Sequence, residues 1–428
     1  MMMMTSSLFA QDKLSLGRAI QIGLNNNFGI QILKIEENII QNELDNINKT
    51  RLPRVELFAG QQNSSNNINS PTSFVQGFYT DRGLNLGVDA NWIIFEGFKV
   101  RIEKSRLEKL NKLSQGNSLI LVENTIQAIM LAYYNTLVQN EGLRVQQDAK
   151  QRSEERFRDA QFQLKYGKVS AYDVLRFENA MLIDSTNSII QAKNMNMAMQ
   201  AVNMAMGNKY YKEYELTDEL KYQKETYNFD KLQQKMASLN GELLNQYLNL
   251  TLRRNDIGLL RAKRYPTLAI NGGATRNSNS TKFPEIPKIK GKNFNFYLNF
   301  SVSYNLFDGG ELRRAMQEGK LREKIENLKI DEIKQELSSE LQNAITNYNI
   351  QLQIITINEK VISNLKENVI LEIDRYKNGF SSLLDYRSLQ QEYLQAEQTR
   401  LEAIYELLVS ETEILKLTGS LTKYNGRK

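Results

Sequence analysis

The chain has 428 residues, a formal net charge of +6 and 41% hydrophobic residues, and it contains neither cysteine nor histidine. Without cysteine there can be no disulfide, thiol catalysis or thiolate metal site. Without histidine the usual general base and the commonest metal ligand are missing. Lys and Arg alternate with Asp and Glu rather than forming basic blocks with interleaved aromatics, so we expect no nucleic-acid partner. We therefore expect no cofactor, no metal site and no enzymatic activity.

The first predicted element is an export signal over residues 1–10, which ends in Leu8-Phe9-Ala10. Small residues before a polar start are typical of a signal-peptide cleavage site. The usual basic leading segment is missing and the apolar part is short, so an ordinary chain terminus is the alternative. We expect a clipped signal, with the mature chain starting near Gln11.

The rest of the chain carries the same architecture twice. Four landmark pairs lie 212 residues apart, namely Gly97 and Gly309, Gly167 and Gly379, Asp173 and Asp385, and Gly207 and Gly419 (309−97, 379−167, 385−173, 419−207). A shared offset over most of the chain indicates a tandem duplication. We predict repeat 1 over 11–207, a polar, tyrosine-rich linker over 208–228, repeat 2 over 229–419 and a tail over 420–428.

Each repeat is expected to consist mostly of long helices. All five prolines lie in two windows, roughly 51–97 and 264–309, and there is none outside them. Long helices require such proline-free stretches, because a proline inside a helix removes a hydrogen bond and breaks or kinks it. We predict leading helices at about 14–50 and 229–263, long helices at about 98–165 and 310–378, and return helices at about 172–206 and 382–418. A heptad track of coiled-coil type runs along the second long helix, through Leu341, Tyr348, Ile355, Ile362, Val369 and Tyr376.

Inside the proline windows the hydrophobic period changes to two, which predicts strands at about 54–66 and 82–96, and at about 267–276 and 293–307. The connections around 67–81 and 275–292 are rich in Asn, Ser, Pro and Gly and are expected to be loops. Phe294 to Leu306 would extend about 43 Å, and a tilted strand of about 9 to 11 residues crosses a bilayer. The Asn- and Ser-rich face suits a wet lumen, and aromatics such as Trp92 suit an interface girdle. A half-buried strand of a soluble sandwich is the alternative.

Two strands per repeat are too few to close a membrane pore. An open sheet in lipid leaves unpaired edge groups, each at a cost of several kcal/mol, and closure takes about eight strands or more. The chain is therefore expected to assemble with copies of itself. Two, three or four copies would give barrels of about 8, 12 or 16 strands. A barrel of about eight strands would be filled by side chains, whereas about twelve strands could leave a lumen. Long helices extending from one side of such a barrel predict a conduit.

Several segments together resemble the TolC-type outer-membrane efflux proteins, the outer membrane factors. They are Leu14 to Ile20 with Leu24 and Asn27, Arg51-Leu52-Pro53, Arg264 to Leu268, the Phe-acid-Gly turns at Gly97 and Gly309, Tyr166 to Leu175, and Tyr376 to Tyr386. The resemblance runs from about residue 14 to 419. It implies a mainly α chain with a transmembrane β-barrel portion, in which a homotrimer forms a 12-stranded barrel that continues into a long periplasmic α-helical coiled-coil barrel.

The same resemblance implies a function, a location and partners. The function is that of an exit duct of a tripartite efflux or type I secretion system, in the outer membrane of a Gram-negative bacterium. The partners are a periplasmic adaptor (membrane fusion) protein, an inner-membrane pump of RND, ABC or MFS type, and outer-membrane lipid. The transported cargo is not specified by the sequence.

The resemblance also implies sites at the two helical tips. Asp173, Tyr376 and Asp385 match a periplasmic gate, and the adaptor would contact Gly167, Val174, Leu175, Gly379 and Leu384. Two gate positions of the family differ here and are Ser381 and Ser388, with Arg375 or Lys168 as candidate substitutes. From the residues alone, an aspartate soon after a tip glycine can instead cap the returning helix.

A different class of protein remains as an alternative, a periplasmic coiled-coil adaptor or scaffold with soluble β-domains. Such proteins also have long helical hairpins. Strict alternation over thirteen positions from Phe294 to Leu306, with an equivalent strand in the first repeat, favours the duct.

Overall fold

The computed structural model describes residues 12–74, 76–283, 287–378, 380–381 and 383–423. The predicted signal segment and Gly379 lie outside the described residues. The chain divides into two compact units. One comprises Glu36–Ser114 and Gln246–Lys329, and the other comprises the remaining three stretches of the chain. No helix in the described ranges combines the length and the apolar character that a bilayer crossing requires.

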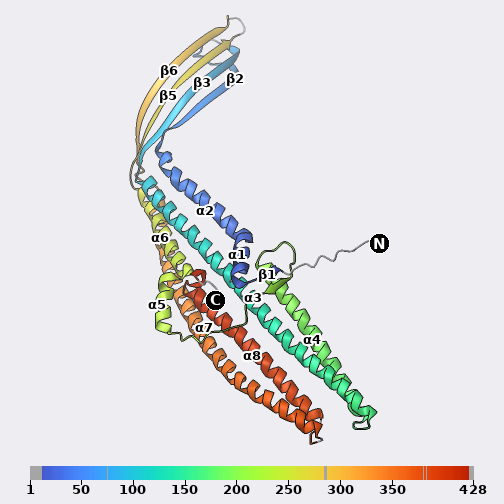
Figure 1. Cartoon of the computed structure of the whole chain (residues 1–428). Coiled ribbons are helices and arrows are strands. Elements are labelled where there is room, and N and C mark those ends of the chain that lie inside the picture. Colours follow the sequence, from blue (N-terminus) through green and yellow to red (C-terminus); the bar gives the residue numbers. More distant parts are fainter. Residues whose placement is uncertain (1–11, 75, 284–286, 379, 382, 424–428) are drawn as a thin grey trace, which may run out of the picture. The chain divides into compact units, whose positions relative to one another are not determined.

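Four long helices account for nearly half of the chain. The long helices are α3 (Lys99–Lys165) and α7 (Glu311–Lys377), and the return helices are α4 (Ala171–Ala205) and α8 (Leu383–Leu417). In Figure 1, α4 runs beside α3 and α8 runs beside α7. Along α7 the predicted heptad track is the buried one, because Leu341, Tyr348 and Ile355 are wholly inaccessible to solvent. The stripe therefore packs the helices together, as the periodicity predicted.

The leading segment of each repeat is two helices, where the sequence predicted one continuous helix. The elements are α1 (Leu16–Asn26) and α2 (Phe28–Asn46) followed by a 3-10 turn (Ile47–Arg51) in repeat 1, and α5 (Phe229–Leu239) and α6 (Gly241–Ala262) in repeat 2. Both breaks fall on an asparagine, and the two asparagines are 213 residues apart (240−27).

Asparagine is the physical cause of each break. Asn27 and Asn240 have extended backbones, with ψ of 110° and 122°. The side-chain oxygen of Asn27 accepts the backbone N–H of Ile30 at 3.1 Å, and that of Asn240 accepts the N–H of Leu243 at 3.0 Å. Asparagine is among the strongest N-cap residues, so each one starts a new helix. The helical period continues across the break, which is why periodicity alone predicted a single helix.

One antiparallel sheet has the strand order β2-β3-β5-β6 (Figure 1). The strands are β2 (Arg54–Ile68), β3 (Gly77–Glu96), β5 (Thr267–Lys282) and β6 (Ile289–Ser303). The predicted loops at 67–81 and 275–292 are therefore too long, since polar residues such as Asn277 and Ser278 are paired in the ladder. Turn-forming side chains do not prevent pairing when both neighbouring strands supply backbone partners.

The tyrosine-rich segment 208–228 is packed against the helices. Within it β4 (Tyr214–Leu216) pairs in parallel with β1 (Asp12–Leu14), a strand that the sequence did not predict. The hydroxyl of Tyr348 on α7 donates to the carbonyl of Gln223 at 2.8 Å, and the ring of Tyr227 lies edge-on to Tyr348 at 4.8 Å. A hydrogen bond to the backbone of the segment and an aromatic contact therefore hold it against α7.

Candidate duct wall and helical tips

The sheet has one apolar and one polar face. Residues paired directly across antiparallel strands point to the same side, so the register defines each face. On one side the rows are apolar, and their large side chains are exposed, with Phe296 and Phe300 each 75% accessible. Three successive rows are Phe300-Ile270-Trp92, Leu298-Gly272-Ala90-Val55 and Phe296-Ala274-Val88-Leu57.

The opposite face is hydrophilic. Its rows contain asparagine, serine, threonine and glycine, among them Asn299-Asn271-Asn91, Asn295-Thr275-Gly87 and Asn293-Asn277-Asn85. Tyr297 on β6 donates its hydroxyl to Asp89 on β3 across this face. Apart from Arg54 and the carboxylates of Glu56, Asp81, Asp89 and Glu96, this face consists mostly of uncharged hydrogen-bonding groups. Such groups can be wetted without binding a solute tightly. The face therefore has the chemistry of a water-filled duct wall.

An aromatic cluster lies where the sheet meets the helices. Phe95, Phe98 and Tyr265 meet edge to face, with ring centroids 5.2 to 6.4 Å apart. The indole N–H of Trp92 donates to the carbonyl of Arg51 at 2.6 Å. Aromatic residues with a polar handle favour the boundary between apolar and wet surroundings. The apolar face thus ends at a belt of the kind found at membrane interfaces.

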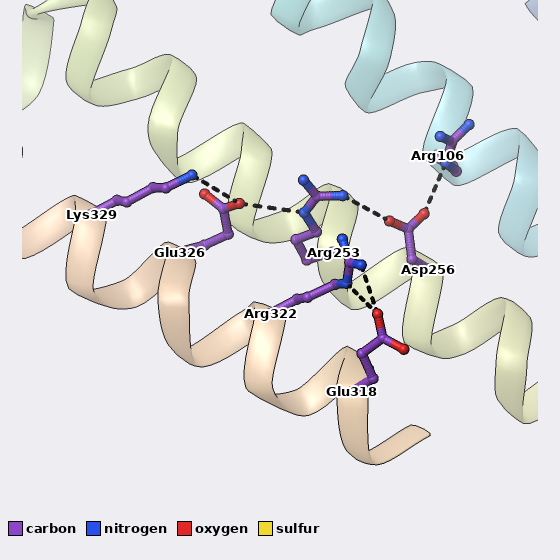
Figure 2. A network of polar contacts seen from close by, with 7 residues as sticks. All are labelled: Arg106, Arg253, Asp256, Glu318, Arg322, Glu326 and Lys329. Atoms are coloured by element: carbon purple, nitrogen blue, oxygen red, sulfur yellow. Dashed lines mark hydrogen bonds and ion pairs between the residues drawn. The ribbon is translucent and has the colours of Figure 1, made fainter. Parts of the chain in front are cut away.

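A polar network joins three helices in the same unit (Figure 2). Asp256 on α6 contacts Arg106 on α3 at 3.1 Å and Arg253 at 3.6 Å, and Arg253 also contacts Glu326 on α7 at 3.4 Å. Glu326 further contacts Lys329 at 3.6 Å, and its side chain is only 7% exposed. A single surface ion pair contributes little to the free energy of unfolding. A half-buried network of several charges, in contrast, holds its side chains in one arrangement. The helices below the sheet are therefore joined by charge as well as by apolar packing.

In the first helical tip, Asp173 caps a helix. Gly167 has a φ of 66° and ends α3, and Ser170 is the N-cap of α4. Ser170 accepts the N–H of Asp173 at 3.2 Å, and the Asp173 carboxylate accepts the N–H of Ser170 at 3.1 Å and its hydroxyl at 2.6 Å. These hydrogen bonds from Ser170 lower the pKa of Asp173. The reciprocal pattern is a capping box, so the capping role inferred from the residues is present.

Tyr376 near the end of α7 lies against the start of α4. Its ring contacts Phe177 edge-on, with centroids 6.0 Å apart. Burial raises the pKa of Tyr376, and the negative charge of Asp173 adds to the rise. The structure therefore brings together two of the three predicted gate residues, on helices from different repeats. Tyr376 connects these helices through an aromatic contact.

The second tip is only partly described. Asp385 lies in the first turn of α8 and interacts with another group of the protein, and Leu384 is exposed. Ser388 donates to Glu392 at 3.4 Å, and Arg375 contacts Glu372 at 3.8 Å. Each contact joins two residues of the same helix, α8 for Ser388 and α7 for Arg375. The ion pair of Arg375 is therefore made within α7.

The strongest polar contact near the tips was missed by the sequence reasoning. Arg387 on α8 contacts both carboxylate oxygens of Asp184 on α4 at 2.6 Å, and Ser153 on α3 also donates to Asp184. Asp184 is only 1% exposed. The repeat relation could not reveal the pair, because the equivalent positions hold Ala396 and Leu175 (184+212, 387−212). The Asp184–Arg387 ion pair therefore has no equivalent at the positions related by the duplication.

Comparisons with known proteins agree with this architecture. Residues 232–420 match the family model described as Outer membrane efflux protein. No curated protein matches the chain significantly. Among solved structures, the CmeC outer membrane channel of Campylobacter jejuni is similar, with a TM-score of 0.75 and 17% identity, covering 95% of this chain and 85% of that one.

Two further channels have the same fold. The MtrE outer membrane channel of Neisseria gonorrhoeae, solved in its open state, gives a TM-score of 0.75 at 16% identity, covering 95% of this chain and 89% of that one. The outer membrane protein VceC of Vibrio cholerae gives 0.71 at 11% identity, covering 94% and 96%. The resemblance to the TolC-type proteins is thereby confirmed: residues 232–420 match the outer membrane efflux protein model, and the chain as a whole has the fold of outer-membrane channels.

Proposed function

We propose that the protein is the outer-membrane exit duct of a Gram-negative export system, and that it conducts its cargo passively. The observation that carries the proposal is the two-faced sheet, with exposed apolar side chains on one side and hydrophilic, mostly uncharged side chains on the other. From Phe294 to Val302 the apolar face extends about 30 Å along β6. At a strand tilt of about 40° this is about 23 Å of membrane thickness, close to the apolar band of about 25 Å in outer-membrane barrels.

The duct is closed by a homotrimer. β2 and β6 are the two outer strands of the sheet, and each pairs on one side only within the described chain. An unpaired edge is costly in lipid. Pairing β6 of one subunit with β2 of the next removes every edge, and three copies make a 12-stranded barrel wide enough for a lumen. The long helices then form the periplasmic tunnel.

Neighbouring residues of β6 provide a sharp test. Leu298 belongs to the apolar face and Asn299 to the polar face. Leu298→Arg would place a charge in lipid, and we expect it to abolish stable trimers, with a cost of about 2–4 kcal/mol per subunit. Asn299→Arg would place the same charge in the lumen, where we expect intact trimers with lower cation conductance. Trimers are assayed by size-exclusion chromatography with light scattering in detergent, and conductance in planar bilayers.

The same measurements distinguish the duct from the alternative. A chain that is monomeric and soluble without detergent, and that tolerates Leu298→Arg as well as Asn299→Arg, contradicts the proposal. That result would favour the coiled-coil adaptor or scaffold with soluble β-domains.

The helical tips are proposed as the contact for a periplasmic adaptor, which links the duct to an inner-membrane pump of RND, ABC or MFS type. Gly167 lies at the tip with open space around it, and Leu175 and Leu384 are exposed beside the turns. Val174 and Gly379 complete the proposed contact. Exposed apolar residues at a turn are suited to packing against another helical hairpin.

A pair of glycines makes the adaptor contact testable. Gly167 and Gly309 have φ of 66° and 65°, and an added Cβ meets nothing within 4 Å at either position. Trp at either position therefore introduces similar backbone strain, but only Gly167 lies at a tip. We expect Gly167→Trp to abolish cross-linking to the adaptor and Gly309→Trp to preserve it. Equal cross-linking by both folded variants would refute the assignment.

A further inference from the structure

The apolar face of the sheet ends in a group of cationic side chains. Arg82 on β3, Arg276 and Lys282 on β5, and Lys290 and Lys292 on β6 are all exposed. The register places Lys292 in the row of Ser278 and Leu84, and Lys290 in the row of Ser280 and Arg82. These five residues are here called the cationic rim. Arg276 is paired with Phe294 in the last row that carries a phenylalanine, and the other four cations lie in the rows beyond it.

Among the described residues of the four strands, no acidic side chain lies on the face that carries the cationic rim. The acidic residues of the four strands, Glu56, Asp81, Asp89 and Glu96, all pair into rows of the opposite face. Among the described residues, no ion pair involves any of the five cations. Five like charges over an apolar band would repel one another without an anionic partner. The surface is thus complementary to a ligand that combines negative charge with a hydrocarbon part.

The position of the cationic rim in the sheet indicates which class of ligand it binds. The rim is at the hairpin end of the sheet, and the aromatic belt of Phe95, Phe98 and Tyr265 is at the helical end. If the helices are periplasmic, as in the proposed function, the rim lies at the level of the outer-leaflet headgroups. In a Gram-negative outer membrane that leaflet consists of a glycolipid whose disaccharide carries phosphates. Arginine and lysine are the residues that bind phosphate through charge-assisted hydrogen bonds.

We propose that the cationic rim is a binding site for the phosphorylated glycolipid of the outer leaflet, with the phosphates at Arg82, Lys282, Lys290 and Lys292 and the acyl chains along the phenylalanines of β6. Arg276 lies one row deeper, where its long side chain can reach up to the phosphate level. The inference rests on the proposed function, because it requires the apolar face to be in the membrane. It deepens that function by assigning a lipid class to named residues.

The test uses the purified full-length protein in a neutral detergent. Its affinity for bisphosphorylated lipid A is measured by microscale thermophoresis, with the dephosphorylated glycolipid and phosphatidylglycerol as comparison ligands. The test variant carries Arg82→Gln, Lys282→Gln, Lys290→Gln and Lys292→Gln. The control removes four exposed lysines of the other unit, with Lys209→Gln, Lys224→Gln, Lys231→Gln and Lys235→Gln.

We expect wild type and the control to bind bisphosphorylated lipid A alike, and the rim variant to bind at least about tenfold more weakly. The dephosphorylated glycolipid should bind all three proteins equally weakly. Equal affinity of the rim variant and wild type would overturn the proposal. So would phosphatidylglycerol binding as tightly as lipid A, or a loss in the control equal to that in the rim variant.

Two further measurements keep the result interpretable. A charge-retaining variant, Lys282→Arg with Lys290→Arg and Lys292→Arg, should keep the wild-type affinity, and its failure to do so would count against a phosphate site. Conductance in planar bilayers of neutral lipid tests the proposed function separately. Wild type that conducts but shows no preference for lipid A would refute only the glycolipid site, whereas wild type that never inserts would refute the duct itself.

Discussion

Arg387 on α8 forms a bidentate ion pair with Asp184 on α4, and both nitrogen–oxygen distances are 2.6 Å. The two residues are 203 positions apart and belong to different repeats. Gln390 and Ser153 also donate to the Asp184 carboxylate, which is almost wholly buried. A buried carboxylate with this many donors fixes the relative position of the helices that supply them.

Removing the cation should be far more damaging than removing the pair. Arg387→Met leaves Asp184 charged and buried, and we expect a loss of about 3–5 kcal/mol in the free energy of unfolding. Arg387→Met with Asp184→Leu should recover most of that loss. Urea unfolding followed by far-UV circular dichroism measures both. Arg144→Met, which breaks an exposed pair with Glu141, serves as control and should change stability by less than about 0.5 kcal/mol.

The glycines that end the two sheet hairpins are related by the duplication but not by their surroundings. Gly97 and Gly309 have φ of 57° and 65°, so alanine is strained at both, by about 1–2 kcal/mol. A Cβ on Gly97 would also lie 2.1 Å from the carbonyl oxygen of Ala262, whereas one on Gly309 meets nothing within 4 Å. We expect Gly97→Ala to lower the yield of heat-stable trimer on gels much more than Gly309→Ala. Similar yields would contradict the close approach to Ala262.

A buried glutamate makes stability depend on pH. Burial raises the pKa of Glu123 on α3, Lys416 opposes the rise and Glu242 adds to it. A raised pKa in the folded state favours the protonated form, so this contribution is fully present below the ordinary value of 4.5 and is lost as pH rises through the folded pKa. Glu123→Gln should therefore raise the unfolding midpoint at pH 7 and give no gain near pH 4. The exposed Glu332→Gln is the control, and a gain for Glu123→Gln at both pH values would refute the assignment.

The gate assignment predicts a change in channel behaviour. Asp385→Ala, especially combined with Tyr376→Phe, should raise single-channel conductance in planar bilayers, because the proposed gate would then lose groups that hold the tip closed. Tyr376→Ala, which also removes the ring contact with Phe177, should raise it further. Unchanged conductance in all of these variants would reject the gate.

Capping and gating by Asp173 can be separated with one control. Ser170→Ala removes the N-cap and costs about 1 kcal/mol, but it leaves the Asp173 charge in place. If Asp173 only caps α4, Asp173→Ala and Ser170→Ala should loosen the tip alike in hydrogen exchange and leave conductance unchanged. If it also gates, only Asp173→Ala should raise conductance.

Local sequence patterns predicted those parts of the fold that depend on a single helix or strand. The seven-residue track from Leu341 onward marked the buried side of α7, because a helix returns to the same side every two turns. Alternation along β6 separated Phe296 from Asn295, because successive residues of a strand face opposite sides. The spacing of Gly97 and Gly309 revealed the duplication without any structure.

Features that join distant segments were beyond such patterns. Asn27 and Asn240 break their helices because each side chain accepts the backbone N–H three residues later and so starts a new helix, although the periodicity continues across them. Polar residues near Asn277 are in a strand because another strand pairs with them. Asp184 and Arg387 are each an ordinary helical residue in sequence. Their pairing depends on how α3, α4 and α8 pack, and packing energy is a property of surfaces that meet only in the folded chain.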